Sequence, residues 1–290
     1  DKLEDRLQLI DLAITMAYNA KANYEDVFSQ VRMWDTIIYN ELLKHDIVIP
    51  MRDMTPREHK EELVGAYVKD PNVGFHDWVV SFDLNSLYPH LIMQYNISPE
   101  TMFPEKRPVN QDDLLNKRID TSDGNCLAAN GAMFKRDKQG MLPRIIQKEY
   151  DDRVTFKKKM LEAEQMYADT KDKKYEKLAR KYYIIQHSKK ISLNSAYGAI
   201  GNRYFRYYDH RQAEAITLSG QLNIKWIEKK LNEYFNKLYK TKGDYIIASD
   251  TDSVYINMAP LVKMTGATDK NKIVKALDKF CSERLEPYIA

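Results

Sequence analysis

The sequence predicts an α+β fold in which antiparallel strands are backed by helices and interrupted by a pair of long antiparallel helices. Apolar, β-favouring runs end at Asp83 and flank Asp250 to Asp252, which is typical of strands joined by tight connections. Long polar segments with helical periodicity lie on both sides of residues 169–173. Because so short a connection makes two helices antiparallel neighbours, we expect a helical hairpin there.

The first part of the chain is predicted to be helical. Apolar residues leave a broad helical face from Leu3 to Ala22, and a second helix is expected from Val31 to Leu43. The polar stretch from Arg52 to His59 contains a proline and is interpreted as a linker. Trp78 to Asp83 favours a strand, and Pro89 suits the first turn of a helix. Asp83 is therefore expected at a strand-to-helix junction.

The remaining elements follow the same periodicities. Met133 to Met141 resembles a hairpin that turns at Asp137 to Gly140. The predicted helix pair spans Pro143 to Ala168 and Lys174 to Ala199. Apolar residues at helical spacing then run from Ile216 to Leu238. They are followed by a tight strand hairpin, residues 245–256, and a helix at residues 273–285.

Composition limits the class of protein. The 290 residues carry 45 Lys and Arg against 42 Asp and Glu, so the net charge of +3 does not by itself indicate a nucleic-acid partner. Cys126 and Cys281 lie far apart without a Cys-x-x-Cys pair, which favours a reducing compartment and argues against structural zinc. No apolar run approaches the ~18 residues of a membrane span. The charged first residues are unlike a signal peptide, and we expect the chain to begin inside a larger protein.

Three aspartates are candidates for metal binding. Asp83 lies at a strand end, and Asp250 and Asp252 lie in a strand hairpin between apolar residues. Buried carboxylates in such places need cations, and a pair of Mg²⁺ ions could activate an attacking hydroxyl and stabilise a leaving oxygen. A surface turn is the alternative for the Asp-x-Asp pair. An EF-hand is excluded because Tyr255 stands where that loop requires glycine.

Cations and polar residues share faces of the predicted helix pair. Arg153 and Lys157 are four residues apart, and Lys190, Asn194 and Tyr197 lie on one face of the second helix. Three such cations on adjacent helices favour a multiply charged anion such as a triphosphate. A solvated basic face is the alternative. No Gly-x-x-x-x-Gly-Lys-Ser/Thr loop is present, so side chains and metal would have to hold the phosphates.

Three segments together resemble the family B DNA polymerases. Asp83 to Pro89 is similar to motif A of that family, Lys190 to Gly198 to motif B, and Asp250 to Ser253 to motif C. The flanking segments Asn96 to Thr101 and Gly201 to Asp209 are similar to the replicative polymerases of T-even-like tailed phages. The resemblance covers nearly the whole chain and implies a palm of antiparallel strands with a two-helix fingers insertion.

The resemblance implies roles for the acidic residues and a cofactor. Asp83, Asp250 and Asp252 would be catalytic, with Asp83 and Asp252 binding metal together with the carbonyl of Leu84. The implied cofactor is a pair of Mg²⁺ ions, for which Mn²⁺ can substitute. One departure from the family pattern lies beside these residues, because Ala248 and Ser249 replace the usual Tyr-Gly before motif C.

The resemblance also implies residues that bind the incoming deoxynucleoside triphosphate: Ser86, Leu87, Tyr88, Arg153, Lys157, Lys190, Asn194, Tyr197 and Gly198. Tyr88 would lie beneath the sugar, where a ribose 2′-hydroxyl has no room, and Tyr197 and Gly198 would pack against the nascent base pair. The alternative for both tyrosines is a place in the core. The residues expected on the DNA side are Arg203, Tyr204, Arg206, Tyr207 and Arg211, for which core and rim positions are the alternative.

The resemblance divides the chain into five parts. They are the tail of an exonuclease domain (1–12), part of an amino-terminal domain and linker (13–54), the first part of the palm (55–140), the fingers (141–202) and the second part of the palm (203–290), which stops before the thumb.

The implied activity is template-directed DNA synthesis in phage replication, by transfer of a nucleotide to a primer 3′-hydroxyl. The expected partners are primer-template DNA, deoxynucleoside triphosphates and replisome proteins such as a sliding clamp, with no membrane. The expected location is intracellular, in the host cytoplasm for a phage protein. Two alternatives remain: a non-catalytic DNA-binding fragment, or another metal-dependent nucleotidyltransferase with a palm.

Overall fold

The computed structural model describes residues 4, 7–52 and 62–289. The predicted helix start at Leu3 and most of the predicted linker from Arg52 to His59 therefore lie outside the described residues. The chain forms two compact units. The first comprises residues up to 63, 88–108 and 121–216, and the second comprises residues 64–87, 109–120 and 217 onward.

Helices make up most of the first unit. They are α2 (Leu9–Ala20), the 3₁₀ helix η1 (Tyr24–Phe28), α3 (Gln30–Lys44), most of α4 (Leu87–Gln94), α6 (Met141–Thr170) and α7 (Lys173–Ile200). The prediction for α3 is confirmed, and α2 ends two residues earlier than predicted. Ser29 caps α3, because its side chain accepts a hydrogen bond from the backbone N–H of Arg32.

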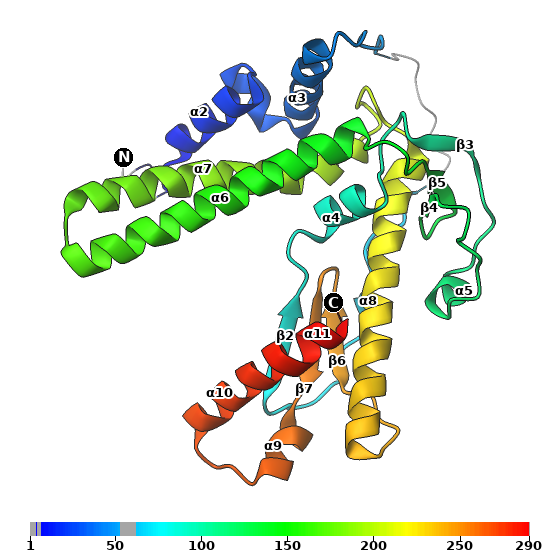
Figure 1. Cartoon of the computed structure of the whole chain (residues 1–290), viewed down its shortest axis with the longest axis vertical. Helices are drawn as coiled ribbons and strands as arrows, with labels where there is room; N and C mark the ends of the chain where they lie inside the picture. Colours follow the sequence, from blue (N-terminus) through cyan, green and yellow to red (C-terminus); the bar gives the residue numbers. More distant parts are fainter. Residues whose placement is uncertain (1–3, 5–6, 53–61, 290) are drawn as a thin grey trace. The chain divides into compact units, whose positions relative to one another are not determined.

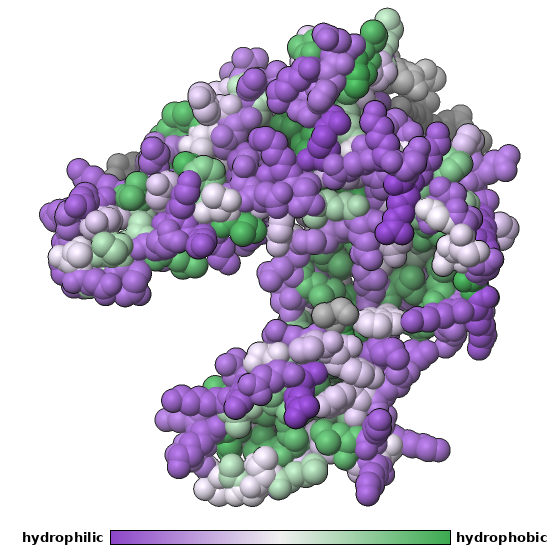
Figure 2. Space-filling view, in the orientation of Figure 1, coloured by the Kyte–Doolittle hydropathy of each residue, from purple (hydrophilic) through white to green (hydrophobic). Residues whose placement is uncertain are grey.

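α6 and α7 form the predicted antiparallel helical hairpin, labelled in Figure 1. Only Lys171 and Asp172 connect them, and the Asp172 side chain accepts a hydrogen bond from the Lys174 backbone N–H at 2.9 Å. This cap satisfies a donor at the start of α7. Figure 2 shows that the visible surface of the hairpin is mostly hydrophilic, so solvent surrounds much of its length.

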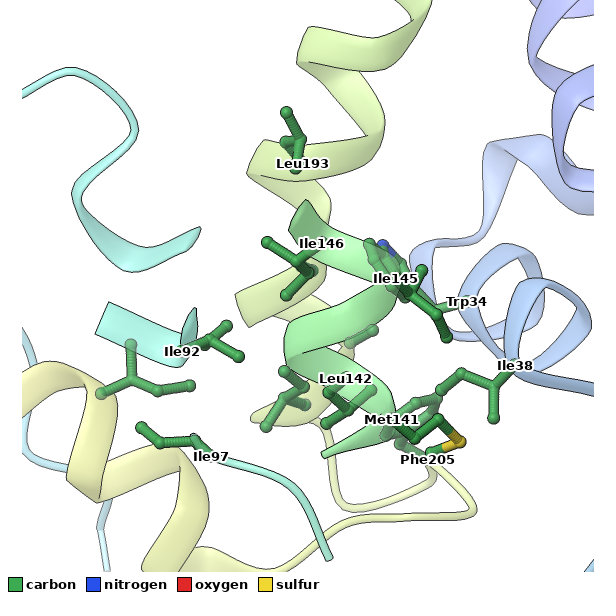
Figure 3. Packing of buried hydrophobic residues seen from close by; sticks show 14 of the residues in the cluster. Trp34, Ile38, Ile92, Ile97, Met141, Leu142, Ile145, Ile146, Leu193 and Phe205 are labelled. Carbon is green, nitrogen blue, oxygen red and sulfur yellow. The ribbon is translucent and has the colours of Figure 1, made fainter. Parts of the chain in front are cut away.

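The base of the hairpin is buried in the core of the first unit. Leu142 and Ile146 of α6 and Leu193 of α7 lie among Trp34 of α3 and Phe205, and each is 2% exposed or less (Figure 3). The Trp34 indole also donates a hydrogen bond to the Ser195 hydroxyl at 3.0 Å. Because a buried indole N–H needs a partner, this contact fixes how α3 packs on α7.

A three-stranded antiparallel sheet completes the first unit. Its order is β3 (Met102–Lys106), β5 (Ala132–Phe134), β4 (Cys126–Leu127). The predicted hairpin from Met133 to Met141 is therefore wrong, because β5 pairs with earlier strands and residues 135–140 form a loop. The Asn96 amide donates to the carbonyls of Lys135 and Lys138, and its oxygen accepts from the Gly140 N–H. The Asn96 side chain thus makes hydrogen bonds to backbone groups of this loop that a second strand of a hairpin would otherwise have made.

The second unit is built on a four-stranded antiparallel sheet. The order is β1 (Val68–Lys69), β6 (Ile246–Asp250), β7 (Ser253–Asn257), β2 (Val79–Asp83). β2 and the β6–β7 hairpin confirm the predicted strands. The helices of this unit are α5 (Gln111–Leu115), α9 (Ala259–Thr265), α10 (Lys270–Phe280), the π-helix η2 (Cys281–Leu285) and α11 (Glu286–Ile289).

A single long helix, α8 (His210–Tyr239), begins in the first unit and continues through the second. Its Leu231 and Phe235 are fully buried with Ile246 and Ile256 of the sheet and Leu277 of α10. The predicted α+β class is confirmed. Among the described residues, no helix combines the length and the apolar character needed to cross a membrane.

Candidate functional site

The second unit brings the predicted acidic residues to one end of its sheet. Asp250 ends β6, and Asp252 lies in the turn before β7. Tyr67, the residue before β1, fixes this turn, because its carbonyl accepts a hydrogen bond from the Thr251 N–H at 3.0 Å. Thr251 has a φ of 54°, a left-handed conformation that is uncommon for a threonine. The turn is therefore held in a defined shape.

β2 places Asp83 beside this turn. Asp83 is paired in register with Ser253, whose hydroxyl donates to the Asp83 carboxylate at 3.2 Å. The next residue, Leu84, donates its N–H to the Asp252 carbonyl at 2.8 Å. These two contacts lock the end of β2 to the β6–β7 turn, so residues 170 positions apart in the sequence become neighbours.

The electrostatics of the three aspartates fit a cation. Burial raises the pKa of Asp252, and the negative charges of Asp83 and Asp250 raise it further. Asp83 and Asp250 thus lie close enough to Asp252 for their charges to repel its carboxylate, and a divalent ion between them would remove that cost. Within the described part of the chain, no three His, Cys, Asp or Glu side chains form a metal-binding group. One or two carboxylates completed by substrate phosphates and water suit Mg²⁺.

The segment after Asp83 turns the chain from β2 into α4. Ser86 has a φ of 55°, in the left-handed region, and Leu87 is buried at the first position of α4. The predicted strand-to-helix junction at Asp83 is thus confirmed. Ser86 and Leu87 lie in the second unit, whereas Tyr88 belongs to the first.

A further carboxylate near the acidic turn, that of Glu228 on α8, was not predicted from the sequence. The hydroxyl of Ser249, which is 1% exposed, donates to Glu228 at 2.5 Å. Burial raises the pKa of Glu228, against this hydrogen bond and the charge of Lys69, which lower it. Ser249 departs from the family pattern, and its partner on α8 accounts for a polar residue at a buried position beside Asp250.

In the first unit, ion pairs link α6 to α7. The Lys189 ammonium lies 2.7 Å from Glu149 and 3.3 Å from Asp152. Asp152 and Lys189 are followed in the sequence by Arg153 and Lys190. Burial lowers the pKa of His187, and the positive charges of Lys190 and Arg153 lower it further. The structure therefore brings two of the predicted triphosphate residues close to one side chain.

The other predicted residues of the helix pair lie along the same two helices. Lys157 of α6 and Lys190 and Asn194 of α7 are exposed, and Arg153 is partly exposed. Exposed side chains at these positions are free of the apolar core and accessible to an anion in solvent. Their assignment to a triphosphate stays a prediction.

Tyr88 and Tyr197 form an aromatic pair. Their ring centroids are 4.8 Å apart with planes inclined at 58°, and both rings are partly exposed. Burial raises the pKa of Tyr197 to about 12, with a further contribution from Tyr88. The next residue, Gly198, lies against the Gln30 side chain of α3, where a Cβ would collide with the Gln30 amide. A larger residue at this position would therefore require the flexible Gln30 side chain to move.

The predicted DNA-side residues divide into two groups. The Arg203 guanidinium lies over the Tyr204 ring, 4.8 Å from its centroid, and Tyr204 is 60% exposed. By contrast, Arg206 donates to both carboxylate oxygens of Asp35 at 2.8 and 3.1 Å.

Tyr207 and Arg211 also make internal contacts. Arg211 donates to both carboxylate oxygens of Asp209, at 3.0 and 2.7 Å, and to the Pro104 carbonyl. Tyr207 is half-buried, and burial raises its pKa to about 12. Arg206 and Arg211 thus bind carboxylates, and Tyr207 packs edge-on against Phe205. The partly exposed Arg203 donates to the hydroxyl of the exposed Tyr204 at 2.8 Å.

The fold is similar to that of a solved protein structure. It superposes on the family B DNA polymerase of the hyperthermophilic archaeon Pyrobaculum calidifontis with a TM-score of 0.62, covering 97% of this chain and 32% of that one at 23% sequence identity. Residues 28–287 match DNA polymerase family B. The chain belongs to this family.

Its sequence is also similar to two curated phage enzymes, each described as a DNA-directed DNA polymerase. Identity is 34% over 99% of the chain for the protein of Escherichia phage RB69 and 34% over 97% for that of Enterobacteria phage T4. The chain spans 37% and 36% of the lengths of these relatives. The predicted resemblance to family B polymerases of T-even-like phages is confirmed.

Proposed function

We infer that the protein carries the reaction centre for template-directed DNA synthesis in phage replication. The observation that carries this function is the register of β2 with β7, which sets Asp83 beside Asp252. Family membership and the similarity to two phage polymerases support it. In the reaction, a primer 3′-oxygen forms a bond to the α-phosphorus of a deoxynucleoside triphosphate, the bond to the bridging oxygen breaks, and pyrophosphate leaves.

The acidic residues would hold two Mg²⁺ ions, for which Mn²⁺ can substitute. Asp83, Asp252 and the Leu84 carbonyl are the proposed ligands, with Asp250 assisting nearby. Bound metal would supply electrostatic stabilisation of the attacking and leaving oxygens. Without a cation, these carboxylates repel one another, as the raised pKa of Asp252 indicates, so the site favours binding of positive charge.

The residues of the helix pair would bind the nucleotide. Arg153 offers bidentate hydrogen bonds to phosphate, and Lys157 and Lys190 offer compact positive charges. Asn194 and the backbone at Ser86 and Leu87 complete the proposed triphosphate contacts.

The aromatic pair would select the sugar and the base pair. Tyr88 would lie under the deoxyribose and reject a 2′-hydroxyl by a steric clash, with Tyr197 and Gly198 against the nascent pair. Closure of the helix pair over a correct pair would exclude water and align the reactants.

Primer-template DNA, deoxynucleoside triphosphates and a sliding clamp are the proposed partners, and the host cytoplasm is the proposed location. Tyr204 and its neighbour Arg203 are the proposed DNA contacts, because an exposed ring can stack on a base and a cation beside it can bind phosphate. Arg206, Tyr207 and Arg211 would position that segment through their internal contacts.

Single-nucleotide primer extension with Mg²⁺ tests this function. Asp252→Asn should lower extension by more than about a hundredfold, because a metal ligand contributes several kcal/mol to the transition state. DNA binding, measured by fluorescence anisotropy, should persist. The matched control is Asp278→Asn, which removes the same charge from an exposed position of α10 in the same unit.

Two results would contradict the proposal. Equal extension by the Asp252 and Asp278 variants would remove the catalytic role of Asp252. DNA binding by the wild-type protein without extension would instead favour a non-catalytic DNA-binding fragment.

A further inference from the structure

His187 lies on the same face of α7 as two of the proposed triphosphate residues. It precedes Lys190 by three residues and Asn194 by seven, a spacing that places all three along one side of a helix over about 10 Å of its axis. Tyr197 continues this line at the other end and contacts Tyr88. The line therefore runs from the aromatic pair, through Asn194 and Lys190, to His187.

The imidazole of His187 is held in a fixed orientation. It stacks on the ring of Tyr183, one turn earlier, with centroids 5.4 Å apart and planes inclined at only 9°. Such stacking limits rotation of the ring, so its nitrogens point in defined directions. His187 is partly exposed, and a ligand can reach it.

Two cations act on this ring, one from each helix. Burial lowers the pKa of His187, and the positive charges of Lys190 on α7 and Arg153 on α6 lower it further. Its ordinary value is 6.5, so the ring is neutral in the free protein at pH 7. A histidine between two phosphate-binding cations will respond to an anion that binds them.

The other groups that face this part of α7 do not offset those cations. The carboxylates of α6 at this level, Glu149 and Asp152, are bound to Lys189. From α2, the Asn19 amide donates to the Ser188 hydroxyl, and from α3 the Trp34 indole donates to the Ser192 carbonyl. Both groups are neutral.

We propose that His187 is a further nucleotide-binding residue, whose imidazole donates a hydrogen bond to the terminal phosphate of the triphosphate held by Arg153 and Lys190. This role rests on the proposed function of the helix pair. The terminal phosphate is the partner because His187 stands at the end of the line farthest from the aromatic pair. A phosphate monoester group titrates near pH 6, so the ring and the phosphate share protons over the same range.

Nucleotide binding should therefore be coupled to proton uptake. The negative charge of the triphosphate offsets the repulsion from Arg153 and Lys190, which favours the charged imidazole. His187 takes up protons from solvent as the nucleotide binds. Because the bound state holds more protons, affinity rises as pH falls toward the lowered pKa of His187 in the free protein.

Titration calorimetry on the protein with a dideoxy-terminated primer-template tests the proposal, because nucleotide then binds without reacting. At pH 6.5, His187→Gln should weaken dATP binding about tenfold, the size of one lost charged hydrogen bond, and should weaken dADP binding much less. In buffers of different ionisation enthalpy, the wild type should take up a proton that the variant does not. His187→Arg should restore affinity and remove its pH dependence between 6 and 8.5.

The control is His45→Gln, which changes an exposed histidine at the end of α3 in the same unit and should bind dATP as the wild type does. The proposal would be overturned if His187→Gln kept the affinity and the pH dependence of the wild type. It would also be overturned if His187→Phe kept both, because phenylalanine can stack on Tyr183 but cannot donate a hydrogen bond. If the wild type bound dADP as tightly as dATP, the terminal-phosphate contact would be wrong while the polymerase function stood. A wild type that binds no nucleotide would overturn both.

Discussion

The ring of Tyr88 lies against Tyr197 at the start of α4, with the centroids 4.8 Å apart. Rings packed in this way cannot move aside without losing contact with each other, so the surface that they would present to a sugar is rigid. A rigid ring can reject a 2′-hydroxyl through a clash that costs the deoxy form nothing. Tyr88 is thus better suited to discrimination than an isolated, flexible side chain would be.

Tyr88→Ala should raise ribonucleotide incorporation. Removing the ring opens space for the 2′-hydroxyl, so the ratio of kcat/KM for ATP to that for dATP should increase about tenfold or more. Single-nucleotide primer extension measures both values. Tyr18→Ala, which removes an exposed ring of α2, is the control. An unchanged ratio in Tyr88→Ala would remove its role under the sugar.

Contacts between residues that are far apart in the sequence could not be predicted from the sequence alone. Asp83, Asp250 and Asp252 could be selected from local pattern because a strand end and a tight hairpin are local features. Glu228 could not, since its partner Ser249 is reached only once α8 packs on the sheet. Likewise, Arg206 looks available in the sequence, but its carboxylate partner, Asp35, lies 171 residues away.

At the scale of elements, the predicted helix pair agrees with α6 and α7 to within one or two residues at each end because its signals are local. α6 and α7 are long segments with helical spacing of their apolar residues. Two residues connect them, and an aspartate caps the start of α7. The hairpin expected from Met133 to Met141 failed for a non-local reason. Its turn residues suit a hairpin, but the Asn96 side chain binds that stretch instead.

The α6–α7 register should depend on Lys189. Its side chain is 8% exposed and that of Glu149 is 13% exposed, so Lys189→Met leaves a buried carboxylate without its partner. The cost should be about 3 kcal/mol of the free energy of unfolding of the first unit, measured from the urea transition of that unit. The double variant Lys189→Met, Glu149→Leu should recover most of this loss, because both charges are then gone.

The control for this pair lies at the other end of α7. Lys174 and Asp172 form an ion pair with side chains 66% and 44% exposed, and Lys174→Met should leave the denaturation midpoint unchanged. A similar small effect for Lys189→Met would show that packing alone sets the register.

At the scale of the whole molecule, the described residues form two buried clusters, one in each unit, and α8 contributes to both. A single free energy of unfolding need not describe such a chain, so local stability is better followed by hydrogen exchange. Glu228 gives the second unit its own pH dependence. Its pKa is raised above the ordinary value of 4.5, which means that the folded unit binds this proton more tightly than the unfolded chain does.

The sign of the effect follows from that difference. Where the folded state holds more protons, stability falls as pH rises from 4.5 through the raised pKa. Glu228→Gln keeps an acceptor for Ser249 but cannot ionise, so amides of β6, β7 and α8 should be better protected than in the wild type at pH 7, and equally protected at pH 4. Glu233→Gln removes the same charge from an exposed position of α8 and is the control. Protection that rises equally in α6 and α7 would place the effect outside the second unit, whereas a gain confined to the sheet and α8 would show that this carboxylate costs stability behind the acidic turn.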